Sequence, residues 1–351
     1  MKRHILILFF ICSLLGMSSC IDEINLALEE SNQAIVIDAW VGSVPGDTYV
    51  KVYRTSSYTS GVLNPSYAEV PLKSVILEQE DGEDIKFRKS DLTSYRQSLG
   101  FVPEPGKAYR LVLETEEGEI FQSDWETMPP RVEIEDIKAH AFQRQVMITS
   151  AQSIFSQIRT FADVQAQITD PGVGEIGYLM ETSGITELYT SANVDNCACI
   201  CYEDEPNIFA GMNVVSNSSF QGKNFGLSLG EIPLSYIGRY LVSTRLRVIT
   251  KSNVDYLNQV DQQQRNSGSI FDPAPFRIKG NIKKLGAENS MVLGNFFLYQ
   301  EVSFEKVLFR TQIRSESLTL NHVLEPIPFV NGSCLEYYTN ASTFVPLPFR
   351  P

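Results

Sequence analysis

The stretch YLVSTRLRVI, residues 240–249, alternates apolar and polar side chains. Successive side chains of an extended chain point to opposite faces, so every second residue shares a face. One face of this stretch holds Tyr240, Val242, Thr244, Leu246 and Val248. A period of two is typical of a half-buried β-strand. We therefore predict a strand here and a mainly β fold around it.

The same pattern recurs through residues 131–351. Shorter alternations occur at Val132/Ile134, Val146/Ile148, Val164/Ala166/Ile168, Val292–Tyr299 and Val302–Phe309. One helix is predicted near residues 253–265, where Tyr256, Leu257 and Val260 have the spacing of an apolar stripe. Ser252 or Asn253 is expected to cap its start. The region is expected to form a β-rich, family-specific domain, either a second sandwich or an open barrel with this short helix.

The preceding region, residues 33–130, holds about seven short strands separated by turn signals, and no convincing helix. Asp81-Gly82 lies between two apolar runs and predicts a hairpin, because glycine tolerates a positive φ. Two consecutive prolines, Pro129-Pro130, end the region and form a natural linker. These features predict an N-terminal β-sandwich of the immunoglobulin or fibronectin type.

The N-terminus carries the features of an export signal. Lys2-Arg3-His4 precedes an apolar run from Ile5 to Leu15, which is too short to span a bilayer. Small residues then lead to Cys20, an arrangement that looks like a bacterial lipobox. We expect residues 1–19 to be removed as a signal peptide and Cys20 to be the site of lipid attachment. Residues 20–32 then form a lipidated acidic tether. The alternative is ordinary secretion with Cys20 free or bridged.

Charge limits the classes of partner. The 351 residues carry 42 acidic and 29 basic side chains, a formal net charge of −13. An acidic chain repels nucleic-acid phosphates and anionic headgroups, so nucleic acid is not an expected partner. Membrane attachment is therefore expected to depend on the lipid.

The cysteines predict disulfides. Four remain after Cys12 leaves with the signal peptide and Cys20 takes the lipid: Cys197, Cys199, Cys201 and Cys334. An even number in an exported chain favours disulfides, and three connectivities are possible. We expect Cys334 to pair with one member of the Cys197–Cys201 cluster, since neighbouring cysteines two residues apart in a strand are poorly placed for bridging. A thiolate metal site is the alternative, but the spacing does not match that of zinc ligands.

No constellation in the sequence predicts catalysis. Residues 226–230 (GLSLG) match the nucleophile motif of hydrolases, and residues 172–177 (GVGEIG) match the dinucleotide fingerprint. Both motifs require a helix directly after them, and the residues that follow oppose one. The acidic runs at 80–84 and 203–205 leave loose calcium binding or paired-acid chemistry open. We predict a non-enzyme with no catalytic residue, cofactor or metal, and with ligand-binding residues that the sequence does not identify.

Three segments carry a family resemblance. They are Ser267–Pro275 (SGSIFDPAP), Gly280-Asn281-Ile282 and Val292–Phe296 (VLGNF). Together with Cys20, they resemble a family of uncharacterised outer-membrane lipoproteins of Bacteroidota, known as a domain of unknown function. The chain departs from the family pattern at Tyr202, where a tryptophan often follows the cysteine, and in its number of neighbouring cysteines.

The resemblance implies a location and a partner. Members are typically encoded beside TonB-dependent receptors, which implies an accessory role in nutrient uptake at the outer membrane. Asp22-Glu23, directly after the lipidated cysteine, resembles a signal for export to the cell surface. We therefore expect a lipid-anchored, non-catalytic partner of a TonB-dependent receptor. The alternative is an independent surface lipoprotein that binds a glycan or a peptide.

Overall fold

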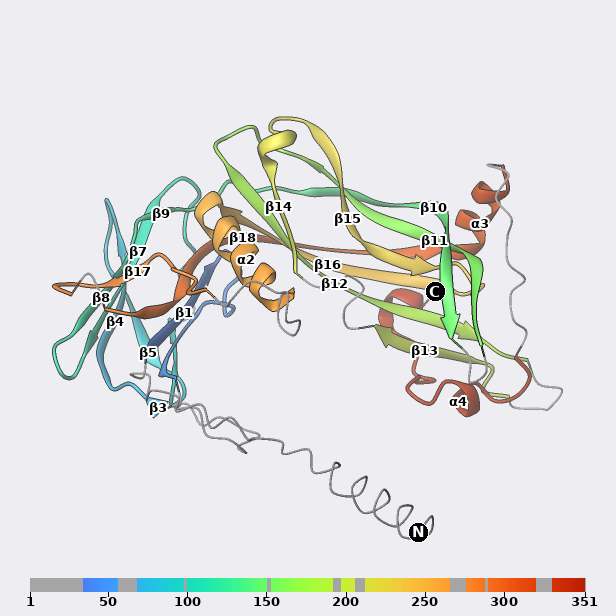
Figure 1. The fold of residues 1–351 in the computed structure, drawn as a ribbon, viewed down its shortest axis with the longest axis horizontal. Coiled ribbons are helices and arrows are strands. Elements are labelled where there is room, and N and C mark those ends of the chain that lie inside the picture. Colours follow the sequence, from blue (N-terminus) through green and yellow to red (C-terminus); the bar gives the residue numbers. More distant parts are fainter. Residues whose placement is uncertain are drawn as a thin grey trace, which may run out of the picture. The chain divides into compact units, whose positions relative to one another are not determined.

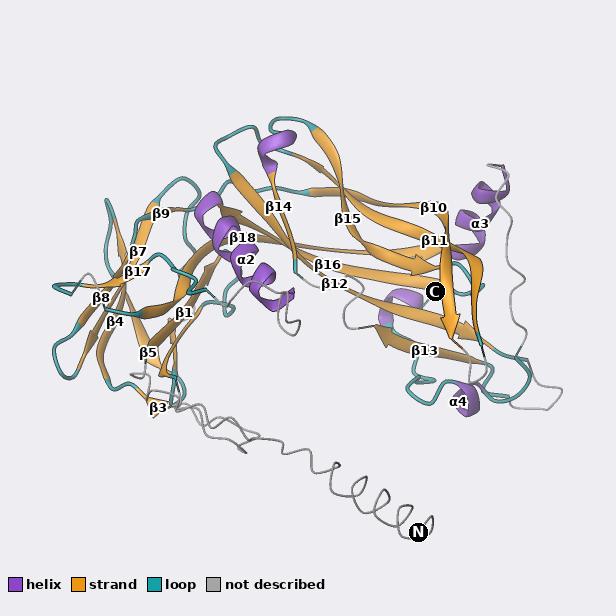
Figure 2. Ribbon diagram, viewed as in Figure 1, coloured by secondary structure: helices purple, strands orange, loops and turns teal. Residues whose placement is uncertain are grey.

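A computed structural model describes residues 34–55, 68–97, 100–149, 153–191, 197–205, 212–265, 276–287, 290–319 and 330–350. Cys20, the tether and the segment Ser267–Pro275 lie outside these ranges. Strands dominate the described part of the chain (Figure 2), which confirms the mainly β fold class. Within it, no helix is both long and apolar enough to cross a membrane.

The elements of residues 34–127 are all strands: β1 (Ile35–Gly42), β2 (Tyr49–Arg54), β3 (Ala68–Glu69), β4 (Leu72–Gln79), β5 (Ile85–Lys89), β6 (Ser94–Gln97), β7 (Ala108–Thr115), β8 (Ile120–Ser123) and β9 (Glu126–Thr127). The later strands are β10 (Ile134–Thr149), β11 (Ile154–Thr169), β12 (Ile176–Tyr189), β13 (Ile200–Glu205), β14 (Asn213–Ser216), β15 (Asn224–Pro233), β16 (Arg239–Thr250), β17 (Ile282–Lys284) and β18 (Val292–Phe309). The helices are η1 (Asn217–Ser219), α2 (Lys251–Arg265), α3 (Arg310–Thr319), α4 (Cys334–Tyr337) and η2 (Leu347–Phe349).

One large sheet joins strands from both halves of the sequence (Figure 1). Its described path runs β13-β12-β16-β18-β1-β2-β6-β5-β4-β7-β8-β17. β1 pairs with β18 in parallel, with Ile35 opposite Val292, whereas the other strand pairs of the sheet are antiparallel. The predicted boundary between residues 33–130 and 131–351 stays a prediction. The structure shows that main-chain hydrogen bonding continues across the two regions.

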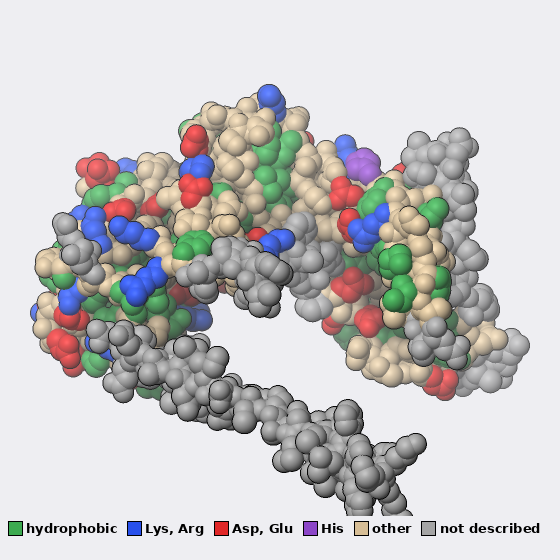
Figure 3. Space-filling view, in the orientation of Figure 1, with side chains coloured by type: hydrophobic (Ala, Val, Ile, Leu, Met, Phe, Trp, Pro, Cys, Tyr) green, Lys and Arg blue, Asp and Glu red, His purple; other side chains and the backbone are tan. Residues whose placement is uncertain are grey.

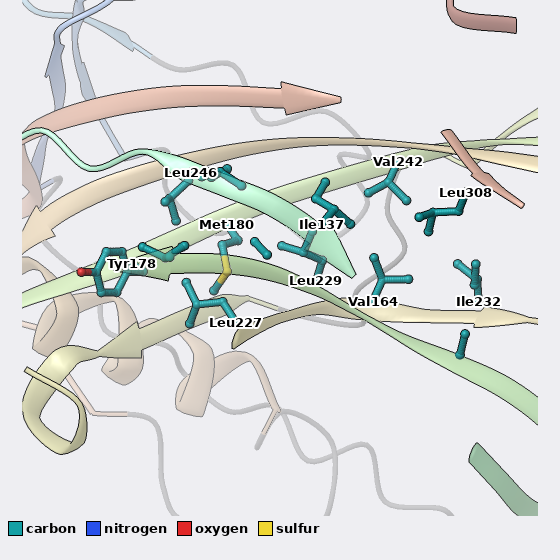
Figure 4. Packing of buried hydrophobic residues seen from close by; sticks show 14 of the residues in the cluster. Ile137, Val164, Tyr178, Met180, Leu227, Leu229, Ile232, Val242, Leu246 and Leu308 are labelled. Carbon is teal, nitrogen blue, oxygen red and sulfur yellow. The ribbon is translucent and has the colours of Figure 1, made fainter. Parts of the chain in front are cut away.

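A second sheet, β10-β11-β15, lies over β12, β16 and β18 and encloses a core between the two layers. Figure 4 shows Ile137, Val164, Leu229 and Val242 directed into this core. The predicted buried face of β16 is confirmed, because its five alternate residues are at most 2% exposed. That burial uses one face of β16 and leaves Ser243, Arg245 and Arg247 on the other.

The strand predictions for residues 33–130 also hold. Every second residue of β1, from Ile35 to Val41, is buried, as are the alternate apolar residues of β7. β4 and β5 pair as the hairpin predicted around Asp81-Gly82, with Ile76 opposite Lys86. These side chains form a core of their own, to which Phe296 and Leu298 of β18 contribute.

The predicted helix is α2. The structure also has α3 and α4, which were not predicted. Ser252 and Asn253 do not act as caps of α2, because their side chains bond elsewhere. Ser252 Oγ donates to Glu126, and Asn253 Oδ1 accepts from Asn295. α3 has no apolar stripe that sequence periodicity could detect, and Ile313 is its buried apolar residue within the described side chains.

Candidate binding groove

The sheet face opposite the main core forms an open groove of about 1120 Å³. Its floor comes from β12, β16 and β18, and its walls come from β1, β2 and α2. The residues that line it are Trp40, Gly46, Asp47, Tyr49, Arg96, Leu179, Met180, Glu181, Thr182, Ser183, Met212, Asn213, Ser243, Thr244, Arg245, Arg247, Leu257, Gln264, Tyr299, Ser303 and Glu305. The groove follows from strand register: Arg245 of β16 lies opposite Glu181 of β12 and Ser303 of β18.

Paired charges form the floor of the groove. Arg247 donates from Nε to Glu301 and from Nη1 to Glu181, each at 2.7 Å. Arg245 donates from Nη2 to the second oxygen of Glu181 at 2.6 Å. On the same face, Ser243 Oγ donates to Glu305 at 2.9 Å. The floor therefore presents guanidinium and carboxylate groups that already neutralise one another.

Burial and neighbouring charges shift the pKa values of three residues that line the groove. Burial opposes the charge on Arg247, but the hydrogen bond to Glu301 and the charge of Glu181 outweigh burial and raise the pKa of Arg247. Burial raises the pKa of Tyr299 to about 12, although the nearby Arg247 acts in the opposite direction. Burial also raises the pKa of Tyr49, with the charge of Asp38 adding to the effect. Both tyrosines are therefore neutral hydroxyl groups at physiological pH.

An aromatic cluster forms the wall at the β1 side. The Trp40 ring stacks on Phe297, with centroids 3.9 Å apart, and meets Tyr299 edge-on at 5.7 Å. Trp40 Nε1 donates to Asp38 at 2.8 Å, which fixes the orientation of the indole. The Arg247 guanidinium lies 5.6 Å from the Trp40 ring centre and 5.3 Å from that of Tyr299. The wall thus presents a rigid, half-buried indole next to fixed charges.

A polar junction positions α2 beside the groove. Asn281 donates from Nδ2 to Glu126 and to the Phe296 carbonyl, and its Oδ1 accepts from the Phe296 amide. The backbone N–H of Asn281 donates to Oδ1 of Asn295. Nδ2 of Asn295 in turn donates to Oδ1 of Asn253 in the first turn of α2. Two of the segments that carry the family resemblance therefore meet here, where they join β17, β18 and α2.

Close backbone approach explains the glycines of those segments. Gly294 has φ +92°, and a Cβ there would lie 2.0 Å from the Ile37 carbonyl oxygen. A Cβ on Gly280 would lie 1.8 Å from the Gly294 carbonyl oxygen. Glycine is required where main chains approach this closely. These positions have a structural role in holding β1, β18 and the segment before β17 together.

The cysteines form two disulfides. Cys201 pairs with Cys334, which agrees with the expectation that Cys334 reaches back to the cluster. Cys197 pairs with Cys199, and here the expectation that neighbours two residues apart do not bridge is wrong. The reason is local: both precede β13, so strand alternation does not fix their side chains, and their Cα atoms are 5.1 Å apart.

The short sequence motifs lie outside the groove. Ser228, the centre of the hydrolase-like motif, is a mid-strand residue of β15 whose hydroxyl donates to Asp163. Residues 172–175 of the dinucleotide-like motif belong to the connection between β11 and β12. Among the described residues, no group of three or more His, Cys, Asp or Glu side chains is placed to hold a metal ion.

The groove residues carry no motif that distinguishes them in the sequence. The signal available was the polar side of β16, where Ser243, Arg245 and Arg247 alternate with the core residues. On its own, this pattern predicts a solvent-facing strand side. Only the sheet register brings Glu181 and Glu301 to the same place.

Comparison with known proteins identifies a family. Residues 21–305 match the family described as a domain of unknown function (DUF4249). This match includes every residue that lines the groove. Comparisons with curated proteins and with solved structures found no match. Because the match covers most of the 351 residues, the chain belongs to the DUF4249 family.

Proposed function

We propose that this protein is a lipid-anchored, non-catalytic binding protein of the outer membrane that serves a TonB-dependent receptor in nutrient uptake. The observation that carries the binding role is the groove above β12, β16 and β18. Its volume of about 1120 Å³ lies just above the roughly 300–1,000 Å³ typical of small-molecule sites. A surface of this size with pre-oriented polar groups suits capture of a ligand.

The arrangement of acids favours binding over catalysis. A general acid or base must reach the proton that it transfers. Glu301 directs its carboxylate to Arg247 and has a side chain only 3% exposed, and both oxygens of Glu181 accept from arginines. The carboxylates of Glu181 and Glu301 are therefore engaged with arginines rather than free to transfer a proton.

The anchor and the partner rest on the sequence. The apolar run before Cys20 and the small residues beside it support lipidation. The resemblance to Bacteroidota outer-membrane lipoproteins supports the location and the receptor partner. A lipid at Cys20 would keep the protein at the membrane, where a receptor takes up its substrate.

Co-purification from the native host tests this proposal. The chain is tagged at its C-terminus, expressed with its own signal peptide and extracted in mild detergent. We expect a stoichiometric TonB-dependent barrel protein in the eluate, and loss of both membrane attachment and the barrel protein in a Cys20→Ala variant. Recovery of the lipidated protein alone, repeated after crosslinking, would contradict the receptor partnership.

The aromatic wall favours a second candidate. An independent surface lipoprotein that binds a glycan or a peptide would need an aromatic surface in an accessible groove, and the half-buried Trp40 and Tyr49 supply one. In that case the protein binds its ligand but is recovered without a barrel partner. The same co-purification therefore separates the two candidates.

A further inference from the structure

We propose that the groove recognises a neutral oligosaccharide. This inference rests on the proposed function, in which the groove is the ligand site, and names the class of ligand. Four properties of the groove favour such a ligand: its balance of charge, the pairing of its strands, its aromatic wall and its size.

The groove lining carries as many acidic as basic side chains, and Glu181 is paired with Arg245 and Arg247. The acidic side chains of the lining are Asp47, Glu181 and Glu305, and the basic ones are Arg96, Arg245 and Arg247. Figure 3 shows acidic and basic side chains interspersed on the visible face of the molecule. An ionic ligand would have to compete with pairs already formed at 2.6–2.7 Å. The electrostatics therefore favour a ligand without net charge.

Carboxylate and guanidinium groups that already form ion pairs can still bind the hydroxyl groups of a ligand. A carboxylate has about four lone-pair sites and a guanidinium has five N–H donors, so one or two contacts leave further capacity. Arg245 has a side chain 52% exposed and Glu181 one 45% exposed, so both are accessible from the groove. Ser183, Ser243 and Ser303 lie on the same face. Such rigid donors and acceptors match the vicinal hydroxyls of a sugar ring, each of which both donates and accepts.

The backbone of β16 and β18 is not available to a ligand. β16 lies between β12 and β18, and β18 lies between β16 and β1. On its other side, β12 pairs with β14 over Gly177–Met180 and with β13 over Gly184–Tyr189. A peptide that binds as an added strand needs an exposed sheet edge. These two inner strands present side chains alone, which disfavours a peptide added as a strand to them and favours a ligand read through its hydroxyl groups.

The aromatic wall supplies the apolar part of the contact. Sugar rings carry C–H faces that pack on aromatic rings, and Trp40 is held in one orientation by Phe297 and Asp38. Tyr49, the β2 neighbour of Trp40, is in register with it and also lines the groove. The volume of about 1120 Å³ exceeds what a single small molecule fills, so an oligomer is the expected occupant.

Tryptophan fluorescence of the full mature chain tests the inference. The chain has two tryptophans, and Trp125 lies outside the groove and is 41% exposed. A Trp125→Phe variant leaves Trp40 as the single reporter. It is titrated with an array of neutral oligosaccharides, with anionic oligosaccharides and with a tryptic digest of casein. We expect a saturable change with one or more neutral oligosaccharides and none with the other two sets.

Variants assign the response to the groove. Trp40→Ala could disturb the packing on Phe297, so the main variant is Arg245→Ala, whose side chain is half exposed. We expect Arg245→Ala to weaken binding roughly tenfold, the loss expected for one charge-assisted hydrogen bond. Arg131→Ala, a surface arginine outside the groove, is the matched control and should bind like the parent.

The outcomes separate this inference from the proposed function. If the protein responds to the peptide digest or to anionic oligosaccharides but not to neutral ones, the proposed ligand class is wrong, although the groove is still a binding site. Binding to no oligosaccharide in the array, or sugar binding that Arg245→Ala leaves unchanged, also overturns it. Co-purification of a barrel receptor is measured separately and is unaffected by any of these results.

Discussion

Arg247 donates from Nε to Oε2 of Glu301 across 2.7 Å, on a face where the Glu301 side chain is only 3% exposed and that of Arg247 13% exposed. The two residues lie opposite each other on β16 and β18. A carboxylate this buried requires a partner, because an uncompensated charge in a protein interior is strongly destabilising. The pair therefore anchors the floor of the groove.

Removing the arginine should be costly. We expect Arg247→Gln to lower the free energy of unfolding by about 3–5 kcal/mol, because Glu301 is left buried without its cation. Chemical denaturation measures the change. Arg131→Gln is the control: its pair with Glu133 is 3.9 Å apart and both side chains are 76% exposed, so the change should stay within about 0.5 kcal/mol. Equal losses in the two variants would show that the Arg247–Glu301 pair contributes no more to stability than an exposed pair does.

The two disulfides should differ in their effect on stability. Cys201 and Cys334 are 133 residues apart in sequence, whereas Cys197 and Cys199 are separated by two. A cross-link stabilises by restricting the unfolded chain, and more so for a longer loop. Replacing both Cys201 and Cys334 with serine should cost about 4–5 kcal/mol, against about 1–2 kcal/mol for Cys197 and Cys199. Thermal unfolding of the two double variants measures this difference, and the reverse order would be incompatible with the connectivity.

Gly294 should tolerate no side chain. It combines φ +92° with a Cβ position 2.0 Å from the Ile37 carbonyl oxygen. Gly118 has φ +84° but open space around its Cβ position, so it isolates the conformational effect. We expect Gly118→Ala to cost about 1–2 kcal/mol and Gly294→Ala clearly more, because β1 must also move away from β18. Equal losses, measured by urea unfolding, would argue against the close parallel pairing.

Acid should weaken the loop held by Asp170. Burial acts to raise the pKa of Asp170, but hydrogen bonds from the Tyr178 hydroxyl, the Gly222 and Gly172 amides and Asn217 outweigh it and lower the pKa below its ordinary 3.8. A carboxyl whose folded-state pKa is depressed stabilises the protein above its unfolded-state pKa. That contribution is lost as the pH falls through the folded-state pKa.

Asp170→Asn tests this dependence. At pH 7 the variant should be less stable, because the amide nitrogen of asparagine faces groups that donate hydrogen bonds. The stability difference between parent and variant should shrink as the pH is lowered below 3.8 toward the folded-state pKa. Unfolding curves at a series of pH values give the comparison. A difference that is constant with pH would mean that Asp170 is not stabilised as a carboxylate.

Local pattern predicted the strands well. The alternation in residues 240–249 and from Ile35 to Val41 matches burial in β16 and β1, since a period of two follows directly from strand geometry. The Asp81-Gly82 hairpin was predictable for the same reason: the turn and its flanking runs are adjacent in sequence.

Long-range pairing was not predictable. β1 and β18 pair in parallel although more than 200 residues separate them, and no sequence signal specifies that choice. The groove depends on this pairing, because it brings Trp40 beside Phe297 and Tyr299. Arg245 and Arg247 alone resemble an ordinary solvent-facing side of a strand. Their place in the candidate groove arises only from the register with β12 and β18.

The most direct measurement is a structure of the protein purified from its native host with its ligand bound. We expect density for sugar rings in the groove, packed against Trp40 and hydrogen-bonded to Arg245 and Glu181. Ligand density elsewhere on the molecule, or a groove filled by the protein's own side chains, would contradict the claim that this sheet face is the recognition site.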